Sequence, residues 1–376
     1  MAFLSYNGKF LIRSGKWLGY TGTGPVPVPI SGDGIMRFQF GNTSISEVEL
    51  YALSGNKGAW TPVRDAMTGD AIPGLWDFNY NNVGGATLED VFNYRLSVQN
   101  LPDGVELVDI KDSYRRNAGF WDDAFRNDTA LTKATITQLD TTHIPSMVHL
   151  FEGCTGLTEA HVEVNSASTN IEEMFNGCVH LTKIYLKVPQ GVGPSMYWSC
   201  MSLQELTVEL TGNTTGWFLR DMGGAEFIDC QGSLTEVTFI HPYGVPASLT
   251  WASGDQYNLF AGCTALRHVN YLVRVNQSDL EVDRMPVSGN TFNMFKGCSS
   301  LMAIPPLSVP GSIIDCSEMF YGCRQVASGI SAAYSALSAA NPHLHRNTFT
   351  NCGVDTQQGY AELQTIPASW GGLATG

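Results

Sequence analysis

The feature that most constrains this chain is an internal repeat marked by cysteine. Eight of the nine cysteines have an aromatic residue three positions earlier, although aromatic residues make up only 11% of the sequence. The pairs are Phe151–Cys154, Phe175–Cys178, Tyr197–Cys200, Phe227–Cys230, Phe260–Cys263, Phe295–Cys298, Phe320–Cys323 and Phe349–Cys352. Cys316 lies outside the motif, and Phe125 begins an earlier copy in which Asp128 replaces the cysteine. Self-similarity at this interval indicates a repeat architecture.

A leucine follows most of these cysteines by three residues and opens a short segment in which apolar and polar residues alternate. The segments that start at Leu181, Leu203 and Leu234 show the alternation clearly. Period-two alternation in sequence rich in β-branched residues predicts a strand with one buried face. The L-x-x-L-x-L spacing predicts that each coil adds one parallel strand to a continuous sheet. The fold class expected is therefore a β-rich α/β solenoid of leucine-rich repeats, preceded by a small β module.

The motif residues have structural explanations. The aromatic side chain and the apolar residue before it are expected to fill the space between the strand and the outer wall of the coil. The glycine that often precedes the cysteine allows a turn with positive φ. Free cysteine behaves as a small apolar side chain and is commonly buried. The cysteines recur once per coil and lack paired C-x-x-C spacing, so we expect free, buried thiols and neither a metal ladder nor a catalytic cysteine.

The pattern Met-Phe-x-Gly-Cys-x-x-Leu at residues 174–181 and 294–301 resembles the BspA-like leucine-rich repeats of bacterial surface proteins and of gut-bacteriophage virion proteins. The resemblance covers roughly residues 120 to 355. The ending at residues 363–372 is also similar to the closing motif of such arrays. Residues 34–40 and 75–80 resemble the β-rich module that often precedes the repeats in phage versions, and residues 3–10 resemble the start of phage fibre proteins.

Four segments are expected along the chain. Residues 1–29 form an N-terminal attachment arm and a proline linker, and residues 30–100 form a β-rich module that caps the array. Residues 101–360 form the leucine-rich-repeat solenoid, and residues 361–376 close it. A helix is expected over the alanine-rich residues 327–340, where Pro342 would stop it. The Gly24-Pro25-Val-Pro27-Val-Pro29 run predicts a stiff linker, and the aromatic residues before it are candidates for burial against a partner. They are Tyr6, Phe10, Trp17 and Tyr20.

Charge and hydropathy exclude several classes of partner. The formal net charge of −14 argues against nucleic acid or an anionic membrane as the main partner, because both favour a basic surface. No segment has the ~18 apolar residues of a membrane helix, so no membrane insertion is expected. The first residues also lack the pattern of a signal peptide. If Met1 is the start, we expect synthesis in a host cytoplasm without export by that route.

A search for chemistry finds weak signals. Gly19-x-x-Gly22-x-Gly24 precedes prolines and does not join a strand to a helix, so it is a poor phosphate loop. His343 and His345 would need a third metal ligand. The adjacent acids Asp122 and Asp123 are expected to point to different sides and not to form an acid–base pair. No enzyme, cofactor or metal site is therefore expected.

The candidate ligand-binding residues are the polar positions between the buried positions of successive strands. Parallel strands align these positions into columns on the concave face of a solenoid. The residues are Glu159, His161, Glu163, Lys183, Tyr185, Lys187, Glu205, Thr207, Glu209, Glu236, Thr238, His268 and Asn270, with Ile240 and Leu272 in the same columns. A mixed-charge strip of this kind suits a protein or glycan ligand. An ordinary solvated face is the alternative, because every solenoid has such columns.

Repeat and resemblance together predict a non-enzymatic binding protein. The resemblance implies a fibre or decoration component of a phage virion, which other virion proteins hold through the N-terminal arm. Its ligand would be a host-surface protein or glycan, and a homo-oligomer is possible. The alternative is a bacterial cell-surface adhesin with the same array, which would need a signal peptide or an anchor.

Overall fold

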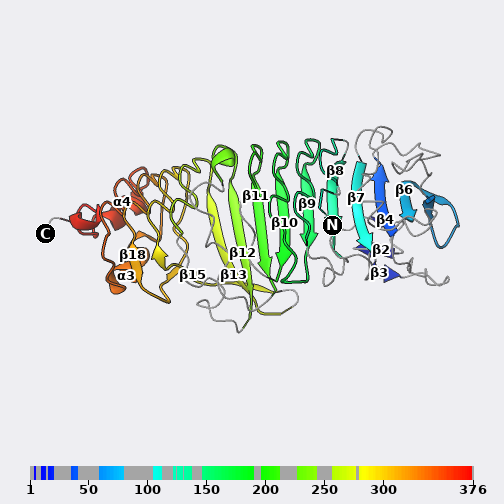
Figure 1. The fold of residues 1–376 in the computed structure, drawn as a ribbon. Helices are drawn as coiled ribbons and strands as arrows, with labels where there is room; N and C mark the ends of the chain where they lie inside the picture. Colours follow the sequence, from blue (N-terminus) through cyan, green and yellow to red (C-terminus); the bar gives the residue numbers. More distant parts are fainter. Residues whose placement is uncertain are drawn as a thin grey trace. The chain divides into compact units, whose positions relative to one another are not determined.

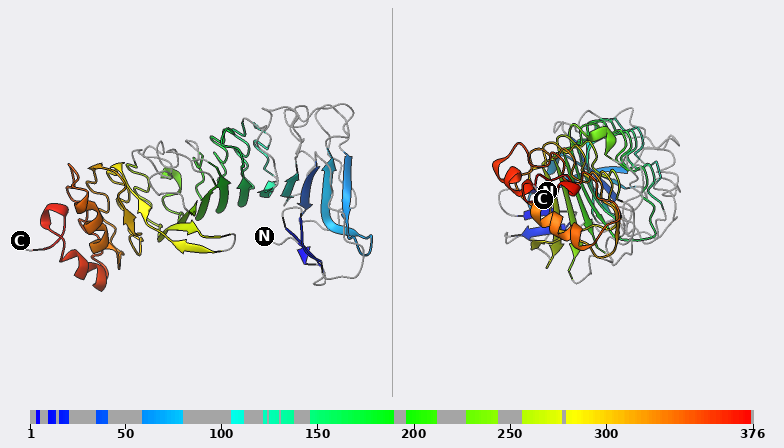
Figure 2. Two further views of the ribbon diagram at one scale, coloured as in Figure 1. Left: turned by 90° about the horizontal axis from the view of Figure 1, so that it is seen from below. Right: turned by 90° about the vertical axis from the view of Figure 1, so that its left-hand side faces the viewer.

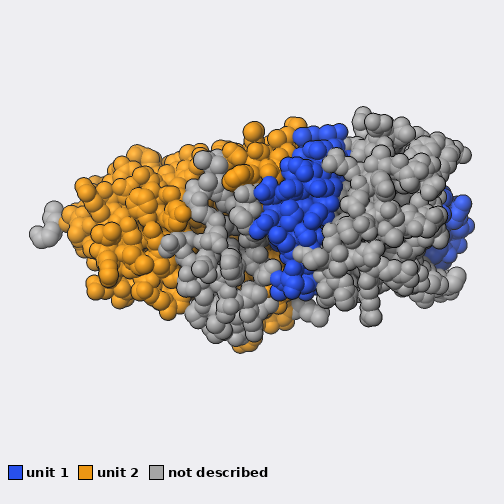
Figure 3. All heavy atoms as spheres, viewed as in Figure 1, with its two compact units in different colours: residues 1–174 blue, residues 175–376 orange. Residues whose placement is uncertain are grey.

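The chain folds into two compact units, residues 1–174 and 175–376 (Figures 1 and 3). The computed structural model describes residues 4–5, 10–13, 16–20, 35–40, 59–79, 105–111, 122–123, 125–129, 131–137, 146–189, 196–211, 227–243, 256–276 and 279–374. No helix among these residues has the length and hydropathy that a membrane crossing requires.

The first unit contains a sheet in which parallel and antiparallel strands meet. Its strands are β4 (Ile35–Phe40), β5 (Ala59–Arg64), β6 (Ala71–Asn79), β7 (Val105–Lys111), β8 (Leu131–Ile136) and β9 (Glu159–Glu163). Strands β7, β8 and β9 are parallel. Strand β4 pairs antiparallel with both β7 and β6, and β5 pairs antiparallel with β6. Strand β4 therefore covers the edge of β7 that would otherwise be open to pairing with another chain.

A second, smaller sheet occupies the segment expected to be an arm. Strands β1 (Leu4–Ser5), β2 (Phe10–Arg13) and β3 (Lys16–Tyr20) pair antiparallel in the order β1-β2-β3. The backbone of this segment thus forms a sheet of its own, which the expectation of an attachment arm did not include. Phe10, Trp17 and Tyr20 lie on β2 and β3, and Tyr6 is outside the described residues. The Gly24–Pro29 linker is outside them too.

The second unit contains the regular part of the parallel sheet. Its strands are β10 (Lys183–Val188), β11 (Glu205–Leu210), β12 (Glu236–Pro242) and β13 (His268–Arg274), which lie side by side (Figures 1 and 2). Each pairs in parallel with the next. Strand β14 (Leu280–Val282) then turns back and pairs antiparallel with β13. One parallel strand per repeat, as the L-x-x-L-x-L spacing predicts, is confirmed for these coils.

The last coils have short strands and helices. Strand β15 (Met285–Pro286) pairs with β17 (Leu307–Ser308), and β16 (Gly289–Asn290) pairs with β18 (Ile313–Asp315). Helix α3 (Ile330–Ala339) confirms the helix expected in the alanine-rich segment. Helix α4 (Gln357–Leu363) and the 3-10 turn η5 (Ala368–Trp370) follow, and a further 3-10 turn, η4 (Ile228–Cys230), lies earlier in this unit.

The motif aromatic residues form a buried ladder. It lies on what we call the turn side of the coils, which comprises the residues around each cysteine. In the second unit, stacked rings run from Tyr197 through Phe227, Phe260, Phe295 and Phe320 to Phe349, with ring centroids 5.2–5.7 Å apart. A backbone ladder accompanies the rings. For example, the N–H of Phe295 donates to the carbonyl oxygen of Met319 in the next coil (2.8 Å). The N–H of Phe349 donates to Trp370 O (2.9 Å), so the closing segment takes the place of one more coil.

All nine cysteines are described, and all are free and buried, which confirms the prediction of unpaired thiols. The thiol of Cys298 donates to the carbonyl oxygen of Phe260 in the preceding coil (3.0 Å), and Cys323 donates likewise to Phe295 (3.0 Å). The thiol therefore satisfies a carbonyl group of the aromatic ladder, which a small donor can reach without a cavity.

Two positions in most described coils have left-handed backbone. The first is the expected one before the cysteine, where Gly177, Gly262, Gly297 and Gly322 have φ of 74–78°. The second lies four residues earlier and was not foreseen. Its members are Asp123, His149, Glu173, Asn258, Asn293, Glu318 and Asn347.

 The φ angles of these seven residues lie between 52° and 60°. Asparagine tolerates this region better than histidine or glutamate does, so the three asparagines fit it best.

The two units do not coincide with the four predicted segments, whose boundaries stay predictions. The unit boundary falls after Met174, inside the segment expected to be the solenoid. Within each unit, the leucine of every described motif is buried, as are the residues before the aromatic rings. The core of the coils is therefore the set of residues that the repeat predicts.

Candidate functional site

The parallel register aligns the predicted binding residues into rows on the outward side of the strands, called the sheet face below. In the second unit the three rows are Lys183–Glu205–Glu236–His268, Tyr185–Thr207–Thr238–Asn270 and Lys187–Glu209–Ile240–Leu272. In the first unit, Lys133 pairs with Glu159 and Thr135 with His161 in the register of β8 and β9. The residues between them, such as Ile184, Leu186 and Val208, are buried in the core. The columns expected from alternation are thus present within each unit.

Charged and polar side chains in these rows pair across neighbouring strands. Lys183 forms an ion pair with Glu205, and Lys133 lies 3.5 Å from Glu159. Asn270 Nδ2 donates to Thr238 Oγ1 in its own row (3.1 Å) and to Glu236 Oε1 in the neighbouring row (2.9 Å). Opposite charges on facing strand positions stabilise a sheet. Much of the sheet face is therefore ordered before any ligand arrives.

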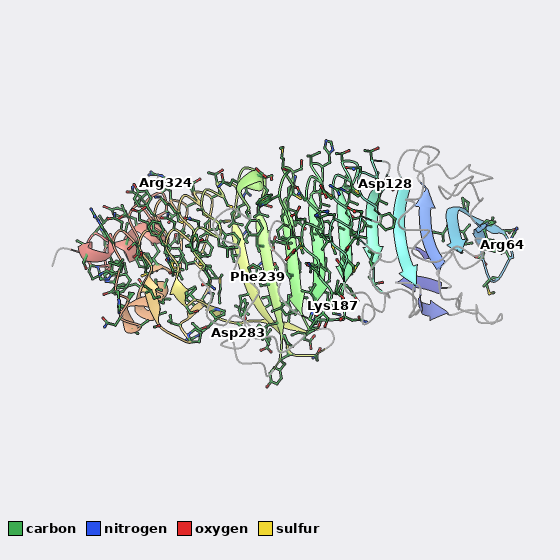
Figure 4. The ribbon with its side chains drawn as sticks, in the orientation of Figure 1. Arg64, Asp128, Lys187, Phe239, Asp283 and Arg324 are labelled. Carbon is green, nitrogen blue, oxygen red and sulfur yellow. The ribbon has the colours of Figure 1, made fainter. Side chains whose placement is uncertain are left out.

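The other side chains of the sheet face are either paired or open, where open means without a side-chain hydrogen bond or ion pair to a described residue. On β9, His161 Nε2 lies 3.2 Å from Glu163 Oε1. Lys187, Thr207 and His268 form no side-chain hydrogen bond or ion pair with other described residues. These three side chains therefore have all their donors and acceptors available for a ligand (Figure 4 labels Lys187).

Glu209 is a correction to the sequence analysis, which expected an exposed side chain. It is only 3% exposed, because Arg274 reaches across β12 and covers it. Arg274 Nε donates to Glu209 Oε1 and Arg274 Nη2 donates to Glu209 Oε2, both at 2.6 Å, and the Tyr185 hydroxyl donates to Oε2 as well. Hydrogen bonds with Glu209 raise the pKa of Arg274, so the guanidinium stays charged. A bidentate pair of this kind fixes both side chains.

Arg274 is a residue of the sheet face that the sequence analysis did not include. It stands two positions after Leu272 in the same alternation on β13, so a longer reading of the columns would have included it. Ile240 is a second correction. The sequence analysis placed it in the solvent-facing columns, but the side chain is buried. The alternation on β12 breaks at Phe239, Ile240 and His241, which are all buried. The Arg274 side chain over this strand accounts for the burial of Ile240.

His241 and Asp283 are as close as a catalytic pair would be, but neither ring nitrogen of His241 is left to act as a general base. His241 Nε2 lies 2.9 Å from Asp283 Oδ2, and Nδ1 lies 3.1 Å from the carbonyl oxygen of Pro242. The ring also stacks on Tyr271 with centroids 4.9 Å apart. Since both nitrogens face acceptors, neither is directed at a nucleophile or a substrate. The pair therefore holds β14 and the residues after it against the sheet.

Comparisons with known proteins add little to this geometry. The sequence matches no protein-family profile, and no curated protein is significantly similar to it. Among solved structures, a leucine-rich repeat protein from T. pallidum is similar with a TM-score of 0.33 and 18% identity. That match covers 55% of this chain and 82% of the other. A TM-score this low does not establish a shared fold, so the repeat assignment rests on the strand register and the coil-to-coil hydrogen bonds described above.

Proposed function

We propose that this chain is a non-enzymatic binding protein that presents its sheet face to a protein or glycan on a bacterial surface. The observation that carries the proposal is the alignment of the predicted residues into three rows, above a core built from the motif residues. Repeat proteins commonly use such extended surfaces for binding. The paired side chains also favour binding, because a surface that is already ordered loses less conformational entropy when a ligand binds.

The setting that we propose is a phage virion, where the N-terminal segment attaches the chain to other virion proteins. The support for this setting is the resemblance of the repeats and of the N-terminal residues to phage proteins. A bacterial cell-surface adhesin is the alternative, and it would use the same sheet face. Detection of the chain in purified phage particles favours the virion, whereas detection in a bacterial envelope favours the adhesin.

Binding to intact bacterial cells and to a glycan array tests the use of the sheet face. The variant K187Q/T207R changes the charge and shape of the open positions without touching a core residue or placing a second carboxylate opposite Glu209. Q325R is the matched control, because Gln325 is exposed on the turn side. We expect K187Q/T207R to lose binding and Q325R to retain it, with unchanged thermal unfolding in both. Equal binding by both variants would place the ligand elsewhere and overturn the proposal.

Deletion of residues 2–23 tests the attachment role separately. If the deleted chain folds and binds cells but no longer joins the particle, the N-terminal segment is the attachment site. If the deleted chain joins particles as the full chain does, that role is wrong. Loss of folding would also contradict it, because the segment would then belong to the folded unit.

A further inference from the structure

A cluster of charged side chains lies on the turn side of the first unit, away from the sheet face. Asp123, His149 and Glu152 present three atoms, one each, that lie within 4.8 Å of one another. His149 Nδ1 is 3.1 Å from Glu152 Oε2 and 3.5 Å from Asp123 Oδ1. On the other side of the ring, His149 Nε2 is 3.4 Å from Glu173 Oε2. The repeat brings these residues together, since Asp123, His149 and Glu173 occupy the same position of successive coils.

We propose that His149 Nδ1, Asp123 Oδ1 and Glu152 Oε2 bind one divalent transition-metal ion, with Zn²⁺ as the best match. Imidazole nitrogen and carboxylate oxygen together are typical zinc ligands. In a tetrahedral site with bonds of about 2.0–2.1 Å, two ligand atoms are about 3.3–3.4 Å apart. The observed separations of 3.1 and 3.5 Å bracket this value.

The burial of one carboxylate oxygen also supports the proposal. Glu152 Oε2 is buried and accepts no hydrogen bond from the described residues, and its ion-pair contact is with His149 Nδ1, 3.1 Å away. The lost hydration of a buried carboxylate oxygen is costly unless a donor or a cation compensates it. A cation bound between this oxygen and the imidazole would remove that cost.

Arg126 holds the two carboxylates in position. Its Nη1 donates to Asp123 Oδ1 (3.0 Å), and its Nη2 donates to Glu152 Oε1 (2.9 Å). Glu152 therefore keeps Oε2 for the ion, and Asp123 Oδ1 keeps a second lone pair. One arginine against the carboxylates of Asp123, Glu152 and Glu173 leaves the cluster with an excess of negative charge. Outer hydrogen bonds that orient ligands are a usual part of metal sites.

The chain supplies its own conservative variants for a test. His149 has φ of 59°, and the equivalent residues of three other coils are Asn258, Asn293 and Asn347. H149N therefore removes the imidazole while it keeps a residue that this backbone accepts. E152Q removes the charge of the second ligand at nearly constant shape. E318Q is the matched control, because Glu318 occupies the same position as His149 in a later coil, where it pairs with Lys296 (2.6 Å).

Calorimetric titration of the chelator-treated full chain with ZnCl₂ tests the proposal. We expect one saturable site that H149N and E152Q each weaken at least about ten-fold and that E318Q leaves unchanged. The Co²⁺-loaded chain should absorb in the visible range without the thiolate charge-transfer band of a cysteine site. No saturable binding, equal binding in all four proteins, or a thiolate band would overturn it.

Discussion

On the turn side of the coils each motif position holds a buried side chain, whereas on the sheet face the same coils hold polar side chains that pair across strands. The turn side repeats one chemistry, aromatic ring and thiol, in nearly every coil. The sheet face changes its residues from coil to coil while the backbone register stays constant. The difference indicates a division of roles, in which the buried motif residues of the turn side supply stability and the polar side chains of the sheet face are free to vary for binding.

The largest expected effect is the loss of one ring from the aromatic ladder. Phe295 is fully buried and stacks on both Phe260 and Phe320. We expect F295A to lower the free energy of unfolding by about 3–5 kcal/mol, because the deletion leaves a cavity between two coils. Urea unfolding followed by circular dichroism measures the change. A loss below about 1 kcal/mol would mean that the ladder collapses around the gap or contributes little.

The Arg274–Glu209 pair is the one place where the sheet face behaves like a core. R274M should cost about 2–3 kcal/mol, because it leaves the buried Glu209 carboxylate without its cation. The double variant E209L/R274M should recover most of this loss, since an apolar pair of similar size has no charge to compensate. The same unfolding experiment compares the two. Equal losses in the single and double variants would show that packing, and not charge, determines the effect.

Alkaline pH should destabilise the turn side through its thiols. Burial raises the pKa of Cys316 to about 12 and raises the pKa of Cys298 and Cys323 as well. The unfolded chain then loses thiol protons at lower pH than the folded chain. The stability is fully present below pH 9 and falls as pH rises towards the folded pKa, by about 1.4 kcal/mol per pH unit for each thiol. Unfolding at pH 8 to 11 measures this slope, and C316A should reduce it by one thiol. A flat profile would contradict the burial of the thiols.

The smallest effect is expected on the open part of the sheet face. Thr207 is partly exposed between buried neighbours and has no side-chain partner among the described residues. T207A should change the free energy of unfolding by less than about 0.5 kcal/mol, as surface substitutions usually do. A larger loss would show that the face contributes to stability, and the contrast between the two sides would weaken.

The sequence predicts the turn side and the rows because both depend on spacing alone. The position of Phe295 or Leu301 in the motif is enough to place its side chain in the core. The sequence does not predict that Arg274 covers Glu209, because Arg274 lies 65 residues away and reaches across an intervening strand. The sequence does not predict the cluster at His149 for the same reason, since Asp123 and Glu152 come from neighbouring coils. Pair contacts between coils depend on side-chain length and direction, which periodicity does not specify.

The pairing of β4 with β7 shows another limit of sequence reasoning. Alternation predicts strands in residues 30–100, but not which edge of the sheet they join. That choice depends on backbone groups far apart in the sequence. It is a tertiary property, unlike the pairing of β1, β2 and β3 with one another, which joins consecutive strands.

Thiol counting in the native and the unfolded chain tests the division between the two sides most directly. All nine cysteines are on the interior of the coils, and none is in a disulfide. We expect almost no thiol to react rapidly with a soluble reagent in the native chain, and nine to react after unfolding in denaturant without reductant. Rapid reaction of most thiols before unfolding, or fewer than nine after it, would contradict the account.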